Sequence, residues 1–74
     1  MQQISYGDGV KVLPEAPEQY RPGAVGSVIS IVESLTKAFE EKTGVPQGEI
    51  AVGVEFSDGT AIELPLRWLV RVGA

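Results

Sequence analysis

The sequence predicts a mainly β domain: a small five-stranded antiparallel barrel with one short helix inserted between strands 2 and 3. Three observations support this class. Several stretches alternate apolar and polar residues, two of them flank Asp58-Gly59 as in a β-hairpin, and residues 34–44 switch to helical spacing. We therefore expect residues 1–74 to form a single domain.

The first strand is expected over residues 9–13. Val10 and Val12 fall on one face and Lys11 on the other, and Pro14 ends the strand. Residues 14–22 contain three prolines, which predicts a long ordered loop. Arg21-Pro22-Gly23 has the form of a type II turn that leads into the next strand.

The second strand, from Ala24 onward, does not alternate cleanly. Val25, Ile29 and Ile31 share one parity, whereas Val28 and Val32 share the other. Either both faces of this strand are covered, or a bulge near Gly26 shifts the register.

A short helix is expected over residues 34–44. Ser34 is a suitable N-cap and Gly44 a suitable C-cap. A helix of this length is marginal by itself. We therefore expect its Leu35, Ala38 and Phe39 edge to dock on the barrel or on a neighbouring subunit.

The third strand is expected over residues 50–56 and the fourth over residues 61–64, joined as a hairpin, and Pro65 ends the fourth strand. Gly53 lies in mid-strand, where it allows either a kink for barrel closure or the close approach of another backbone. Residues 66–68 are expected to form a 3₁₀ turn, and residues 69–72 a fifth strand beside the first. The expected core consists of Val10, Val12, Val54, Phe56, Ile62 and Leu64.

Composition limits how so short a chain is stabilised. Seventy-four residues bury only about 60% of the unfolded surface, and the absence of Cys and His removes disulfides and the common structural zinc sites. Association with other subunits is then the main way left to stabilise the folded chain.

The net charge of −4 and the scattered Lys and Arg residues disfavour binding to nucleic acid and to anionic membranes. A cytoplasmic location is the expectation.

Catalytic chemistry has little support in this sequence. Without Cys or His, the usual nucleophile and base pairs cannot be assembled, and a Ser-Lys dyad is only formally available. Glu55 opposite Glu63 across the hairpin is the best pair of carboxylates, but both fall at outward positions typical of a solvated sheet face. We expect no cofactor and no metal, and we favour a non-catalytic role over an enzyme.

The order of the motifs resembles that of SH3-like small barrels. Residues 7–12 resemble their Gly-Asp-x-Val-x-Val opening strand, and residues 23–28 their Gly-x-x-Gly-x-Val second strand. The Asp58-Gly59 hairpin and a one-turn helix at residues 66–68 complete the likeness, which spans nearly the whole chain except residues 34–44.

Two families of SH3-like barrels resemble this chain, but one differs from it in charge and the other in one motif. The small barrel subunit of photosystem I is similar in Val10-Lys-Val and Val25-Gly-Ser-Val, but it presents a more basic surface than this acidic chain. Type II dihydrofolate reductases are similar in their opening strand and final turn. Their Val-Gln-Ile-Tyr motif is replaced here by residues 61–64, with Ile62 and Leu64 where glutamine and tyrosine would line the pore. That resemblance therefore implies an oligomer without the activity.

The sequence favours a protein-interaction or assembly module that self-associates through an apolar face. Its partner is expected to be a second copy or another protein. The alternative is an oligomeric small-ligand binder or enzyme whose site forms at a subunit interface. Aromatic residues anchor interfaces, and Trp68 serves either as such an anchor or as a plug in one end of the barrel. The candidate interaction residues are Trp68, Tyr20, Leu35, Phe39 and Tyr6.

Overall fold

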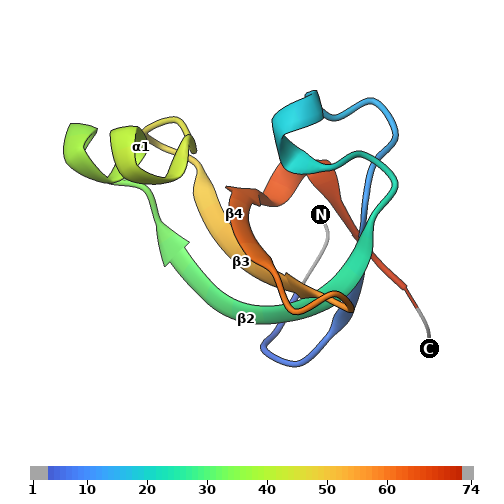
Figure 1. Ribbon diagram of the computed structural model, residues 1–74. Helices are drawn as coiled ribbons and strands as arrows, with labels where there is room; N and C mark the ends of the chain where they lie inside the picture. Colours follow the sequence, from blue (N-terminus) through green and yellow to red (C-terminus); the bar gives the residue numbers. More distant parts are fainter. Residues whose placement is uncertain (1–3, 73–74) are drawn as a thin grey trace.

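The computed structural model describes residues 4–72 of the chain (Figure 1). Within this range the protein is mainly β, and its short α-helix lies between the second and third strands as expected. In chain order the elements are β1 (Gly9–Val12), the 3₁₀ helix η1 (Glu18–Tyr20), β2 (Val25–Glu33), α1 (Lys37–Thr43), β3 (Ile50–Phe56), β4 (Ala61–Pro65), the 3₁₀ helix η2 (Leu66–Trp68) and β5 (Leu69–Arg71).

The five strands form one antiparallel sheet in the order β4-β3-β2-β1-β5. The prediction that β5 returns beside β1 is confirmed. The prediction of a closed barrel is wrong, because β4 and β5 remain the two edges of the sheet within residues 4–72. Only the three residues of η2 separate them, so the chain passes from one edge to the other without forming a ladder between the two strands. The sheet instead curls strongly, as the curved β2 shows in Figure 1.

The core lies on one face of this curled sheet, and it contains the six residues that the alternation predicts, with Ile62 only partly buried. Val28 and Leu69 join them from β2 and β5, and Ala16 and Tyr20 join from the first loop. The buried members are Val10, Val12, Ala16, Tyr20, Val28, Val52, Val54, Phe56, Leu64 and Leu69. The loop of residues 14–22 thus supplies part of the core that a closed barrel would have drawn from its strands.

Two turns follow the local rules of the sequence. Gly23 has φ of +83°, and the Ala24 N–H donates to the Arg21 carbonyl over 3.1 Å, which confirms the type II turn. The hairpin has a three-residue loop of residues 57–59, because the Phe56 N–H donates to the Thr60 carbonyl. Gly59 alone adopts positive φ there, as in a type I turn that ends in a bulge.

β2 contains a bulge, but not where the sequence suggested. Val28 pairs with Val54 and Ser30 pairs with Gly53, so Ile29 is the extra residue. The prediction of a bulge near Gly26 is therefore wrong by three residues. The bulge explains the mixed parity of β2, since Val28 and Ile31 both face the core although they are three positions apart, an odd spacing that would place them on opposite faces of a regular strand.

Gly26 and Gly53 are required for close packing. A Cβ at Gly26 would lie 2.5 Å from the Glu55 carbonyl oxygen, on the neighbouring strand. A Cβ at Gly53 would instead overlap the hydroxyl of Ser30. Close approach is thus a feature of both positions, through backbone at Gly26 and through a side chain at Gly53.

α1 is shorter than predicted and is held mainly by hydrogen bonds. The Thr36 hydroxyl, not Ser34, accepts from the Phe39 N–H over 3.1 Å, so the predicted N-cap is wrong. Ser34 is fully buried and donates instead to the Val45 carbonyl over 2.9 Å. Gly44 is confirmed as the C-cap, with φ of +80° and its N–H bonded to the Glu40 carbonyl. No residue of α1 itself is buried.

Candidate functional site

Tyr20, one of the predicted interaction residues, lies inside the protein. Its ring belongs to the core, and its hydroxyl donates to the Gly44 carbonyl over 2.6 Å. A buried tyrosine hydroxyl needs such a partner. Tyr20 therefore links η1 to the C-cap of α1, and its side chain offers little surface to a partner.

Trp68 in η2 is half buried and packs against the core. The Arg67 guanidinium lies 5.0 Å from the centre of the Trp68 ring, a cation–π arrangement. The Arg67 Nε also donates to Glu49 Oε1 over 2.8 Å, which ties η2 to the residue before β3. Trp68 thus contributes to packing and still keeps some accessible surface.

The remaining predicted residues differ in exposure. Leu35 is 69% exposed and Tyr6 is 66% exposed, whereas Phe39 is half buried on α1. Since Tyr20 is turned inward and Trp68 is half covered, the five predicted residues do not share one environment. The structure instead draws attention to a face that the prediction did not include.

That face is the solvent side of β2, a strand that lies between β1 and β3 in the sheet. Val25, Ile29 and Val32 are 54%, 51% and 44% exposed, and we call them the β2 stripe. Val25 and Val32 lie opposite the core, because their register partners alternate with the core residues of β1 and β3. Ile29 is the bulged residue and has no register partner, and its side chain lies near Gly53 on the same face. At about 3.3 Å per residue the stripe extends over about 23 Å. Its sequence signal was the irregular alternation of β2. The outer face of this strand mixes the stripe residues with Ser27 and Ser30.

A concavity of about 770 Å³ lies beside Ile29, the middle residue of this stripe. We call it the β4 concavity. Its floor includes Ser30, Gly53 and Glu63, which are register partners on the outer side of β2, β3 and β4. Its walls come from η1 and from the C-terminal end of α1, which Tyr20 holds together. The full lining is Gln19, Tyr20, Ile29, Ser30, Lys42, Thr43, Gly44, Gly53, Ala61, Ile62 and Glu63.

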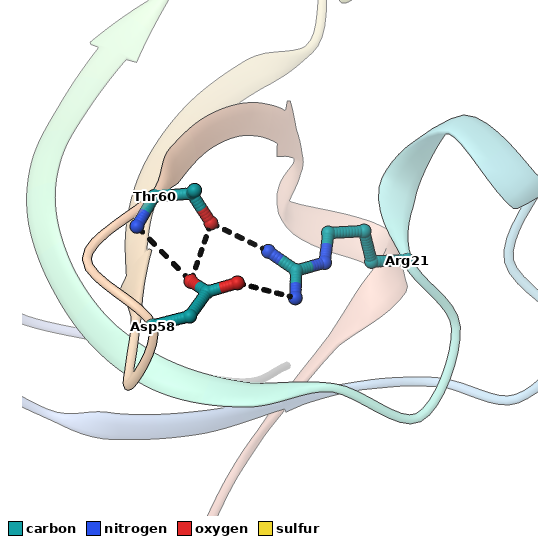
Figure 2. A network of polar contacts seen from close by, with 3 residues as sticks. All are labelled: Arg21, Asp58 and Thr60. Atoms are coloured by element: carbon teal, nitrogen blue, oxygen red, sulfur yellow. Dashed lines mark hydrogen bonds and ion pairs between the residues drawn. The ribbon is translucent and has the colours of Figure 1, made fainter.

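A polar network fastens the first loop to the β3–β4 hairpin (Figure 2). Arg21 Nη1 donates to the Thr60 hydroxyl over 2.7 Å, and Nη2 lies 3.4 Å from Asp58 Oδ2. The Arg21 guanidinium also stacks 4.1 Å from the centre of the Phe56 ring. These contacts offset the strain at Arg21, whose φ of +60° is unusual for a residue other than glycine.

The same network lowers the pKa of Asp58 below its ordinary value of 3.8. The largest cause is the Thr60 hydroxyl, which donates to Asp58 Oδ1 over 2.6 Å, followed by the Thr60 backbone N–H. Because both donors stabilise the charged carboxylate, Asp58 remains ionised. This exposed carboxylate fixes the hairpin loop and has no partner that would make it a general acid.

The acidic side chains of the described residues do not gather into a metal-binding group. Within residues 4–72 no three His, Cys, Asp or Glu side chains lie close enough to hold a metal ion. The prediction that Glu55 lies opposite Glu63 is wrong, because Glu55 pairs with Ala61 and Glu63 pairs with Gly53. The register follows the three-residue hairpin loop, which offsets the two carboxylates by two positions. In the same part of the chain, no helix has the length and apolar character that crossing a bilayer requires.

Comparison with protein-family models and with curated proteins finds no match for this chain, and comparison with solved structures finds none either. The family resemblance drawn from short motifs therefore gains no independent support.

Proposed function

We propose that the protein is a non-catalytic interaction or assembly module that self-associates by covering the β2 stripe with a second copy. The observation that carries the proposal is the stripe itself: three large apolar side chains on the solvent face of a central strand. Leu35, which follows β2, extends the same apolar character toward α1. Apolar residues gathered in this way are typical of interfaces.

The class of fold proposed for this module is SH3-like. Its supports are the one-turn helix η2 before the last strand and the tight hairpin between β3 and β4. The sheet of this chain is open at β4 and β5, so the class is proposed with a strongly curled sheet in place of a closed barrel.

Magnitudes indicate a weak complex. Burying a large aliphatic side chain completely contributes about 1.5–3 kcal/mol, and each stripe residue is only about half exposed. The stripe residues of both copies together then contribute on the order of 5–9 kcal/mol, against at least about 4 kcal/mol for lost translational and rotational freedom. The net charge of −4 on each copy adds repulsion that salt screens. We therefore expect a dimer that forms at high micromolar concentration and tightens with added salt.

Size-exclusion chromatography with light scattering tests this proposal directly. The expected result is a mass that rises above one chain at high micromolar concentration, and Val32→Lys should return it to one chain. Ser57→Lys adds the same charge in the exposed hairpin loop, away from the stripe, and should leave association nearly unchanged. A monomer at high micromolar concentration in both low and high salt would contradict the proposal.

A second candidate function is an oligomeric small-ligand binder or enzyme with its site at the subunit interface. The observation that favours it is that Ile29 belongs both to the β2 stripe and to the lining of the β4 concavity. A second copy seated on the stripe would therefore extend the wall of the concavity. A rise in melting temperature with folate or a nicotinamide cofactor, lost in Val32→Lys, is the expected result for this candidate. An unchanged melting temperature counts against it.

A further inference from the structure

The β4 concavity carries polar side chains that the protein itself leaves without partners. Lys42 and Glu63 make no ion pair, and the Gln19 amide and Ser30 hydroxyl make no side-chain hydrogen bond within the described residues. By contrast, all three arginines in residues 4–72 are paired with carboxylates. The charged and polar groups of the concavity are thus available to a ligand.

Their arrangement separates the two charges. Glu63 lies on the floor, and the side chain of Ser30 leans over Gly53, which separates Ser30 from Glu63 across the sheet. Lys42 lies on the wall formed by the end of α1, and Gln19 lies near Gly44 on the same side, its amide nitrogen 3.7 Å from where a Cβ of Gly44 would stand. A negative group is therefore favoured at the wall and a positive group at the floor.

Apolar surface lies between these groups. Ile29 and Ile62 line the concavity from β2 and β4, and Tyr20 lines it from η1. The volume of about 770 Å³ is within the range of small-ligand pockets, about 300–1,000 Å³. The floor crosses two inter-strand spacings, or about 10 Å, which is also the span of an extended tripeptide.

We propose that the β4 concavity binds a zwitterionic ligand of short-peptide size that carries an apolar side chain. Its carboxylate lies toward Lys42 and Gln19, and its ammonium group lies toward Glu63 and Ser30. Its apolar side chain packs on Ile29 and Ile62. The charges are solvent-accessible and the cavity is open, so a Kd on the order of 1 mM is expected for a single short peptide. All of these contacts come from one chain, but Ile29 also belongs to the β2 stripe, so peptide binding and the proposed self-association would compete for this residue.

An NMR titration with the tripeptide alanyl-leucyl-alanine tests this assignment. The protein titrated is the Val32→Lys variant, at a concentration where it is monomeric. Its Gly44 and Gly53 amide signals should shift as peptide is added. The N-acetylated and the C-amidated forms each lack one charge and should each bind about fivefold more weakly. The site is ruled out if no shift occurs at about 10 mM peptide, or if the shifts map away from the concavity.

Charge-removing variants then assign each end of the peptide. Lys42→Gln should weaken binding of the free peptide about fivefold but leave binding of the C-amidated peptide unchanged. Glu63→Gln should also weaken binding of the free peptide about fivefold, but leave binding of the N-acetylated peptide unchanged. Lys37→Gln and Glu55→Gln remove like charges outside the lining and should leave all three affinities unchanged. Equal binding of the three peptides, or equal effects of the four variants, would overturn the proposal. Retained dimerisation of Lys42→Gln keeps the outcome distinct from that of the self-association test.

Discussion

The core and the excursion of residues 34–49 are stabilised by different interactions. The core is apolar, and its members come from all five strands and the first loop. The excursion contains α1, which buries no residue, and it is held by the bonds of Ser34 with Val45, Gly48 and Glu49 and by the bond of Tyr20 to Gly44. Only Val45 supplies a fully buried apolar side chain there. The comparison shows that alternating apolar residues hold the sheet together, whereas a few polar contacts position the helix.

The largest expected effect is in the core. Leu64→Ala should lower the free energy of unfolding by about 3 kcal/mol, because it leaves a cavity at a fully buried position. That is a large share of the roughly 4–11 kcal/mol expected for a domain of this size. Leu35→Ala, in the excursion, should change stability by less than about 0.5 kcal/mol. Urea denaturation measures the free energy of unfolding of both variants. Equal decreases in the two variants would contradict the difference between the core and the excursion.

The close approach of β3 to β2 should give the next largest effect. Gly26→Ala should cost about 2–3 kcal/mol, because its Cβ would meet the Glu55 carbonyl oxygen and the Val54 side chain. Gly53→Ala should cost less, since the Ser30 hydroxyl can rotate away. In a Ser30→Ala background the stability cost of Gly53→Ala should fall further. Thermal denaturation of Gly26→Ala, Gly53→Ala, Ser30→Ala and the double variant Ser30→Ala/Gly53→Ala would measure these costs. A Gly26→Ala variant as stable as the parent would contradict this close packing of β2 on β3.

The anchor of the excursion should show an intermediate effect. Ser34→Ala removes the buried donor to the Val45 carbonyl and should cost about 1–2 kcal/mol. Amide hydrogen exchange should also accelerate in residues 44–49 more than in β1. Ser27→Ala, at an exposed position of β2, is the matched control and should have almost no effect. Uniform acceleration across the protein would mean that the excursion is not a separate unit of stability.

The smallest effect on stability is expected at the β3–β4 hairpin, and it should appear at acidic pH. The pKa of Asp58 is lowered in the folded protein, so its stabilising contribution is present above the ordinary value of 3.8 and is lost as pH falls through the folded pKa. Thr60→Val removes the hydroxyl donor and should raise the pKa of Asp58 toward 3.8, whereas Thr60→Ser should retain the lowered pKa. An NMR titration of the Asp58 carboxyl carbon measures both. An unchanged pKa in Thr60→Val would show that the hydroxyl is not the main cause.

Much of the candidate surface could not be predicted from the sequence. Tyr20 is predicted to contribute to an interaction face, but the first loop folds over the sheet and places its ring in the core. The β2 stripe was hidden in an irregular pattern, because the bulge at Ile29 changes the parity of every later residue. The concavity was also out of reach, since its lining joins η1, α1 and three strands that lie far apart in the chain.

Local sequence preferences are enough to predict the strands, the two turns, the 3₁₀ helix η2 and the C-cap at Gly44. They also predict the fully or nearly fully buried core residues Val10, Val12, Val54, Phe56 and Leu64. These depend on local preferences and on the period of two, which act between near neighbours in the chain. Three features emerge only once the chain is folded: the sheet stays open, Ser34 is an internal anchor and Ile29 is the bulged residue. Those features arise from contacts between segments distant in sequence, where burial and hydrogen bonding outweigh local preference.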